Sequence, residues 1–141
     1  MSHFFVDTNV LLDFLMRRAP FAVAAAELFQ LAEDRKIWLY CSSLTFSQAH
    51  YVLRKVIGAA RAQELLLDIA DLVTIVAVDS RTVNDALRSS FLDFEDALQY
   101  FAATAEAEPA LEAIVTRDPK GFVAGMLPIL TPPEALTRLV S

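Results

Sequence analysis

The chain has 141 residues, of which 55% are hydrophobic, and a formal net charge of −6. A chain of this length supports one sizeable hydrophobic core, so we expect a single domain over residues 1–141. The excess of acidic residues excludes nucleic-acid binding through a broad basic surface, and a polyanionic ligand would need a local basic patch, a bound cation or a partner chain. Basic pairs at residues 17–18, 35–36 and 54–55 are the candidates for such a patch, although pairs of this kind commonly lie at helix ends.

The sequence also indicates the cellular compartment of the protein. Its apolar stretches are far shorter than the ~18 consecutive residues of a transmembrane helix, and its first residues lack the features of an export signal. Cys41 is the only cysteine, so an internal disulfide is impossible. We therefore expect a cytoplasmic protein that does not enter a membrane.

Short segments rich in β-branched and aromatic residues alternate with longer segments of helical periodicity. In chain order we expect a strand at 3–7, a helix from 11 to Ala19-Pro20, a helix at 21–33, a strand at 37–42, helices at 44–57 and 59–71, a strand at 72–79, helices at 80–90 and 94–108, a strand at 112–116, a turn at 117–121, a short strand within 126–130 and a helix at 132–140. Strands that alternate with helices require crossover connections. We therefore predict a three-layer α/β/α domain with a central parallel sheet of four to five strands.

Acidic residues fall at three places that this topology brings to one edge of the sheet. Asp7 ends the first strand, and Asp118 follows the fourth. Asp93, Glu95 and Asp96 lie at the start of a helix that faces the same edge. Open parallel sheets bind ligands beyond the carboxyl ends of their strands, near the point where the strand order reverses. We therefore expect acidic groups distant in sequence to converge there.

Convergent carboxylates would support metal-assisted hydrolysis of a phosphodiester. Carboxylates that share a site repel one another, whereas a divalent cation keeps them ionised. Hard oxygen ligands suit Mg²⁺ or Mn²⁺, which would bind a phosphate oxygen and lower the pKa of an attacking water. Such a cation would also draw a phosphate into an acidic cleft.

Each acidic position also has a purely structural explanation. Asp7 is a favoured helix-capping residue, and Asp93 with Asp96 three positions later has the spacing of a capping box. Asp118, which precedes a proline, is typical of a turn. These explanations account for an acid at each place, but not for the collection of all three at one edge.

Three segments carry a resemblance to a known family. VDTNVLLDFL at 6–15, FEDALQ at 94–99 and IVTRDPKGF at 114–122 resemble the PIN domain, particularly the bacterial subfamily related to VapC toxins. The similarity spans nearly the whole chain, with the motifs in family order. It implies a Mg²⁺- or Mn²⁺-dependent ribonuclease specific for single-stranded RNA, frequent homodimers, and a small antitoxin partner that blocks the site.

The resemblance also assigns residues. It implies that Asp7, Asp96 and Asp118 are the first, third and fourth catalytic acids and bind the metal. Asn9 is the usual polar neighbour of the first acid, and Thr116 matches the hydroxyl two residues before the last.

The second acid of the family is replaced in this chain. Gln48, within TFSQAHYVLRK, stands where many PIN domains have a glutamate, and Glu95 beside the third acid is a candidate for a supporting contact. Glutamine keeps an oxygen ligand but loses the charge, so metal affinity should fall and a second metal becomes doubtful. The sequence therefore leaves two functions open: a weakened one-metal nuclease, or a non-catalytic PIN-fold binding or scaffold module. A phosphoacceptor receiver fits poorly, because the acidic pair and the lysine that it requires are missing.

Overall fold

A computed structural model of the protein describes residues 1–105, 110–122 and 125–140. Its elements are β1 (Ser2–Val6), α1 (Thr8–Leu15), α2 (Ala22–Glu33), β2 (Ile37–Ser42), α3 (Ser43–Ile57), α4 (Ala59–Leu72), β3 (Thr74–Val76), α5 (Ser80–Leu87), α6 (Phe94–Thr104), β4 (Ala113–Val115), the 3₁₀ helix η1 (Pro119–Phe122), β5 (Ile129–Leu130) and α7 (Pro132–Val140). Within these ranges, every helix is too short or too polar to cross a membrane.

The five strands form one parallel sheet in the order β3-β2-β1-β4-β5. β1 lies at the centre, where Phe4 pairs with Leu39 of β2 on one side and with Ala113 of β4 on the other. The chain builds outward from β1 to β3 and then returns to place β4 against the free side of β1. The strand order therefore reverses beside β1, as in the doubly wound sheets that bind ligands at this point. The predicted parallel sheet is confirmed.

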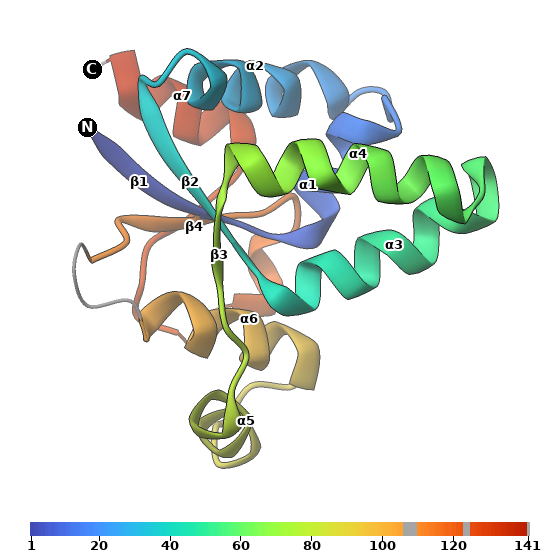
Figure 1. Ribbon diagram of the computed structural model, residues 1–141. Coiled ribbons are helices and arrows are strands. Elements are labelled where there is room, and N and C mark those ends of the chain that lie inside the picture. Colours follow the sequence, from blue (N-terminus) through green and yellow to red (C-terminus); the bar gives the residue numbers. More distant parts are fainter. Residues whose placement is uncertain (106–109, 123–124, 141) are drawn as a thin grey trace.

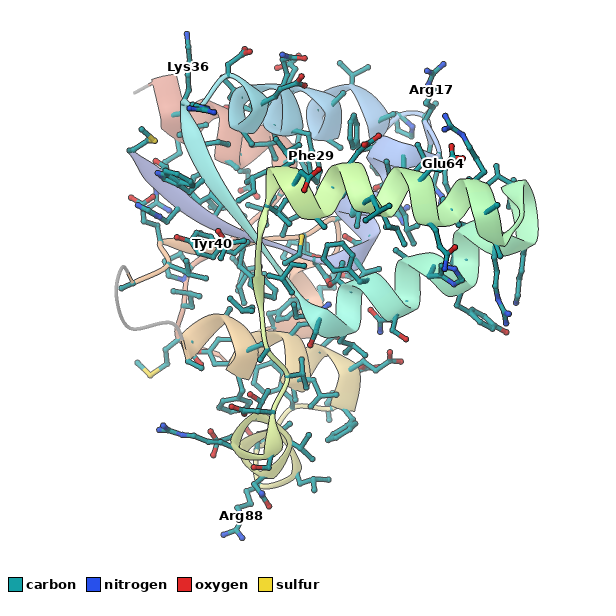
Figure 2. The ribbon with its side chains drawn as sticks, viewed as in Figure 1. Arg17, Phe29, Lys36, Tyr40, Glu64 and Arg88 are labelled. Atoms are coloured by element: carbon teal, nitrogen blue, oxygen red, sulfur yellow. The ribbon has the colours of Figure 1, made fainter. Side chains whose placement is uncertain are left out.

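Helices cover both faces of this sheet (Figure 1). Along β1, Phe4 and Val6 enter a core formed with α1, α2, α3, α4 and α7, whereas Phe5 enters a second core with α6 and η1. This alternation follows from the two-residue period of a strand. Phe29 of α2 lies in the first core and Tyr40 of β2 in the second (Figure 2). The predicted three-layer architecture is confirmed.

The structure corrects two expected boundaries in the first half of the chain. β3 covers Thr74–Val76 instead of residues 72–79, because it is an edge strand that pairs only with β2. α1 spans Thr8–Leu15 and does not extend to Ala19-Pro20, since Arg17 adopts a left-handed conformation with φ 52° that is incompatible with a continuing helix.

Two boundaries near the C-terminus also differ. The expected turn at 117–121 contains the short helix η1, Pro119–Phe122. The helix expected at 94–108 ends at Thr104, and residues 106–109 of that prediction lie outside the described residues.

Helix ends elsewhere agree with local sequence signals. Ser42 caps α3, with its hydroxyl accepting a 3.2 Å hydrogen bond from the backbone N–H of Thr45. Asp79 caps α5 in the same way, by accepting a 3.0 Å bond from the N–H of Thr82. Gly58 ends α3 with φ 83°, a conformation that glycine adopts without strain. These caps fix where α3 and α5 leave the sheet.

Candidate active site

A cleft of about 310 Å³ lies at the carboxyl edge of the sheet. Its wall is built from the end of β1, the start of α1, one side of α3 and the start of α6. Four acidic residues line it, namely Asp7, Asp93, Glu95 and Asp96. The cleft therefore occupies the position, beside the reversal of strand order, where a sheet of this kind binds ligands.

Asp7 is the most firmly held of these acids. It follows β1 and caps α1, with one carboxylate oxygen accepting a 2.8 Å hydrogen bond from the N–H of Thr8 and the other accepting a 2.9 Å bond from the hydroxyl of Thr116. Its own N–H donates to the carbonyl of Val115 in β4 at 2.9 Å. Burial raises the pKa of Asp7, whereas these hydrogen bonds lower it and the charge of Asp118 raises it further. Asp7 therefore both caps α1 and lines the cleft.

Asp96 lies in the first turn of α6 and shares the electrostatic environment of Asp7. Its N–H donates a 2.9 Å hydrogen bond to the capping carboxylate of Asp93, so the predicted cap is present. Burial raises the pKa of Asp96 to about 6, and the charges of Asp93, Asp7 and Asp118 contribute to the rise. The backbone of Gly121 in η1 approaches the Asp96 carboxylate so closely that a Cβ at position 121 would collide with it. A larger residue at position 121 would therefore require the Asp96 carboxylate to move.

Asp118 is exposed on the loop after β4, next to the cleft wall. The hydroxyl of Thr116 organises this loop, since it donates to Asp7 and accepts a 3.2 Å hydrogen bond from the N–H of Asp118. Asn9 of α1 holds the same loop, because its side-chain oxygen accepts a 3.2 Å bond from the N–H of Arg117 and its amide donates to Thr116 at 3.4 Å. Asp118 thereby lies close enough for its charge to act on Asp7 and on Asp96.

Gln48 reaches into the cleft from α3. Its carboxamide oxygen accepts a 2.6 Å hydrogen bond from the hydroxyl of Thr8, and its amide nitrogen donates to a carboxylate oxygen of Glu95. The neutral side chain thus bridges α1 and α6. A glutamate at this position would place a carboxylate against that of Glu95, which is favourable only beside a cation.

Gln99 is a buried member of the site that our sequence analysis missed. Its amide nitrogen donates to the hydroxyls of Thr45 at 2.8 Å and Thr8 at 3.1 Å and approaches Asp7 at 3.5 Å, and its oxygen accepts a 2.5 Å bond from the hydroxyl of Ser42. This one carboxamide links α1, β2, α3, α6 and the residue that follows β1, below the cleft. The available signal was its position three residues after the acid of FEDALQ, which puts both side chains on one face of a helix.

A buried ion pair, also missed from sequence, lies behind the cleft. Asp13 of α1 is almost fully buried, and Arg117 makes an ion pair with it at 3.2 Å from the loop that carries Asp118. Burial raises the pKa of Asp13, whereas the charge of Arg117 lowers it. The Arg117 guanidinium also stacks over the ring of Phe21 at 4.4 Å. The pair ties the loop after β4 to α1.

The side-chain oxygens of the site are of the type that binds a divalent cation, but they do not surround a cation on all sides. Across residues 1–105, 110–122 and 125–140, no three His, Cys, Asp or Glu side chains form a group that would hold a metal ion by themselves. The carboxylates of Asp7, Asp96 and Asp118 are hard oxygen donors of the type that Mg²⁺ and Mn²⁺ prefer. Mg²⁺ commonly takes one or two protein carboxylates and completes its shell with water and substrate phosphate. The site therefore fits a cation that is bound together with a phosphate.

The domain is an α/β domain whose five-stranded parallel sheet has an acidic cleft where the strand order reverses. The family model of the PIN domain matches residues 3–120. The chain therefore belongs to the PIN-domain family, a family of nucleases, and the resemblance inferred from its three motifs is confirmed. None of the curated proteins compared with the chain matches it.

Solved structures share this fold at low sequence identity. The VapBC2 complex from Rickettsia felis, bound to a DNA fragment from its promoter, is 17% identical, with a TM-score of 0.66 over 92% of this chain and 98% of that one. A toxin–antitoxin complex from Klebsiella pneumoniae is 22% identical, with a TM-score of 0.66 over 94% and 98% of the two chains. VapC20 from Mycobacterium tuberculosis, described as a toxin that cleaves the sarcin–ricin loop, is 17% identical, with a TM-score of 0.65 over 88% and 96%. These similarities extend the fold assignment to nearly the whole chain.

Proposed function

We propose that this protein is a metal-dependent endoribonuclease that hydrolyses phosphodiester bonds of single-stranded RNA. The observation that carries the proposal is the approach of Asp7, Asp96 and Asp118 at one edge of the sheet, where the charge of Asp118 raises the pKa of both Asp7 and Asp96. Such an arrangement does not serve stability, because crowded carboxylates destabilise the folded state in the absence of a cation.

The roles of the acids follow from their surroundings. Asp7 and Asp96 line the cleft and would hold Mg²⁺ or Mn²⁺, with Asp118 completing the set from the neighbouring loop. The cation, when bound, supplies charge for the phosphate and acidifies the attacking water. Thr116 and Asn9 orient the first and last acids through the hydrogen bonds described above.

Gln48 and Glu95 determine how strongly the site attracts a cation. Because the amide of Gln48 already donates to Glu95, the carboxylate of Glu95 is held to one side of the cleft without a cation. The neutral residue lowers the attraction for a second cation. We therefore propose a nuclease that works with one metal.

The partners are proposed by analogy with the similar structures. Several of these are toxin–antitoxin complexes, so we propose that this chain is the toxin of such a pair and is blocked by a small antitoxin. The resemblance to the PIN family also implies homodimers, which we propose for this chain. A cytoplasmic location agrees with a lone, buried cysteine.

The neutral Gln48 and the open arrangement of the acids favour one alternative, a PIN-fold binding module without catalysis. Calorimetric titration of Mn²⁺ and Mg²⁺, combined with cleavage of a labelled single-stranded RNA, separates the two. The comparison uses the wild type, Asp118→Asn, which is exposed and has little structural cost, and Asp7→Asn, which retains a capping residue.

Asp71→Asn is the matched control. Asp71 is exposed near the end of α4, just before β3 begins, and so lies at the opposite edge of the sheet. Metal binding and cleavage that are lost in the Asp7 and Asp118 variants but kept in the control would support the nuclease. Metal binding without cleavage in the wild type would support the module, and no binding at millimolar metal would leave the acids as structural caps.

A further inference from the structure

The cleft must admit a polyanion although its wall is acidic. Four carboxylates line it, and the whole chain has a net charge of −6. Among the described residues of the cleft wall, one carries a positive charge, Arg18. This residue belongs to a basic pair whose expected place was a solvated helix end, so its presence in the cleft calls for an explanation.

The backbone fixes Arg18 beside the cleft. α1 ends at Leu15, and the left-handed Arg17 turns the chain so that the N–H of Arg18 donates to the carbonyl of Asp13 at 3.1 Å. The carbonyl of Arg18 in turn accepts hydrogen bonds from the N–H groups of Phe21 at 2.9 Å and Ala22 at 2.8 Å. The start of the Arg18 side chain is therefore held in one place by main-chain bonds that do not depend on its guanidinium.

The guanidinium itself is only loosely held. Its contacts among the described residues are a 3.8 Å approach to a carboxylate oxygen of Asp13 and a 3.3 Å contact with the sulfur of Met16. Both are weak, and a guanidinium has five N–H donors. About a third of the Arg18 side chain is exposed. Most of its hydrogen-bonding capacity is therefore available to a ligand.

Neutralising Asp13 does not account for Arg18. Arg117 already pairs with Asp13 at 3.2 Å, through the other carboxylate oxygen and at a shorter distance. Arg18 lowers the pKa of Asp13 through its charge from 3.8 Å, but it forms no hydrogen bond with the Asp13 oxygen that it faces, so its N–H donors are not used there.

We propose that Arg18 binds a phosphate group of the RNA strand and thereby draws it into the acidic cleft. The inference rests on the proposed function and names a substrate contact of the same site. A guanidinium matches two phosphate oxygens with two parallel hydrogen bonds, which an ammonium group does not. Arg18 and a carboxylate-bound cation would then hold the RNA backbone from two sides. A contact of this kind is independent of the base.

The test measures RNA affinity and its salt dependence by fluorescence anisotropy with a labelled single-stranded RNA. Ca²⁺ replaces the catalytic metal, because it occupies oxygen sites, and a gel checks that the RNA stays intact. For a single strand, the logarithm of affinity changes with the logarithm of salt concentration by about −0.7 per phosphate contact. Arg18→Gln should therefore weaken binding about fivefold to tenfold and make the slope less negative by about 0.7. Arg18→Lys should keep the slope and lose about twofold to threefold in affinity.

Arg17→Gln is the matched control, because Arg17 is the neighbouring residue with the same charge but is exposed and does not line the cleft; Figure 2 shows it projecting from the surface. Thermal unfolding of each variant verifies the fold. Equal affinities and slopes for Arg17→Gln and Arg18→Gln would overturn the inference, as would a wild type that does not bind RNA.

Cleavage by the wild type is scored separately, so that the two proposals fail independently. Cleavage without an effect of Arg18→Gln would refute the role of Arg18 alone. Arg18-dependent binding without cleavage would support the role of Arg18 and refute the catalytic part of the proposed function.

Discussion

Replacing Asp96 by asparagine is expected to stabilise the metal-free protein at neutral pH. The pKa of Asp96 rises from its ordinary value of 3.8 to about 6 in the folded state, because burial and four neighbouring carboxylates disfavour its charge. The folded state therefore binds this proton more tightly than the unfolded state does. Stability falls as the pH rises through the window from about 4 to about 6, and it stays reduced above that window.

The size of the effect follows from the two pKa values. Their difference corresponds to about 3 kcal/mol at about 1.36 kcal/mol per pH unit. Asp96 keeps contact with solvent, which screens its charge, so we expect about half of this. Asparagine also loses about 0.5 kcal/mol of attraction to the N-terminus of α6. The net gain in the free energy of unfolding should be about 1 kcal/mol, or about 2–6 °C in Tm.

Urea unfolding in EDTA, followed by circular dichroism between pH 4 and pH 8, tests this reasoning. The difference between Asp96→Asn and the wild type should be close to zero at pH 4 and reach its full value above pH 6. Added Mn²⁺ should reverse the order, because only the wild type keeps the metal-binding carboxylate. Asp71→Asn, at the opposite edge of the sheet, should show neither effect. A variant that is no more stable than the wild type at pH 8 would refute the view that Asp96 carries a destabilising charge.

Three further substitutions test individual contacts of the site. Gln48→Glu should raise Mn²⁺ affinity and metal-dependent cleavage while lowering stability in EDTA, since the new carboxylate faces Glu95; unchanged Mn²⁺ affinity in calorimetry would count against this role. Gln99→Leu should lower the free energy of unfolding in urea by about 2–3 kcal/mol, because it removes one hydrogen-bond partner from each of three buried hydroxyls, and a loss below about 0.5 kcal/mol would contradict this. Arg117→Gln should lower the free energy of unfolding by about 2 kcal/mol in the same assay, because Asp13 loses its closer partner. It should also weaken Mn²⁺ binding, because the loop that carries Asp118 is no longer tied to α1. An unchanged free energy of unfolding would mean that the ion pair contributes nothing.

Sequence patterns predicted the fold because its determinants are local. Short runs of β-branched and aromatic residues identified the buried strands, and caps such as Ser42 and Asp79 set the starts of the helices that follow. The order of strands and helices then led to a parallel sheet, with carboxylates at the ends of the first and fourth strands. The errors came at β3 and α1, where edge position and the conformation of Arg17 overrode apolar periodicity.

The site was predictable only in part. The sequence placed Asp7, Asp96 and Asp118 at one edge, and the proposal that they bind metal remains a prediction. The spacing from Asp96 put Gln99 on the same helix face, but a glutamine on a helix is most often exposed, so the burial of Gln99 beneath the acids was not predicted. Nor did the sequence indicate that Arg18 turns toward the cleft.

The sequence by itself determined which elements form and which acids lie at their ends, because strand periodicity and helix caps depend on neighbours a few residues apart. Only the tertiary structure decided the partners of those acids. The hydroxyl of Thr116 reaches Asp7 across 109 positions of the chain, and the amide of Gln99 reaches Thr8 across 91. Such contacts depend on how helices pack on the sheet, and packing is fixed by the burial of the whole core and not by any one segment.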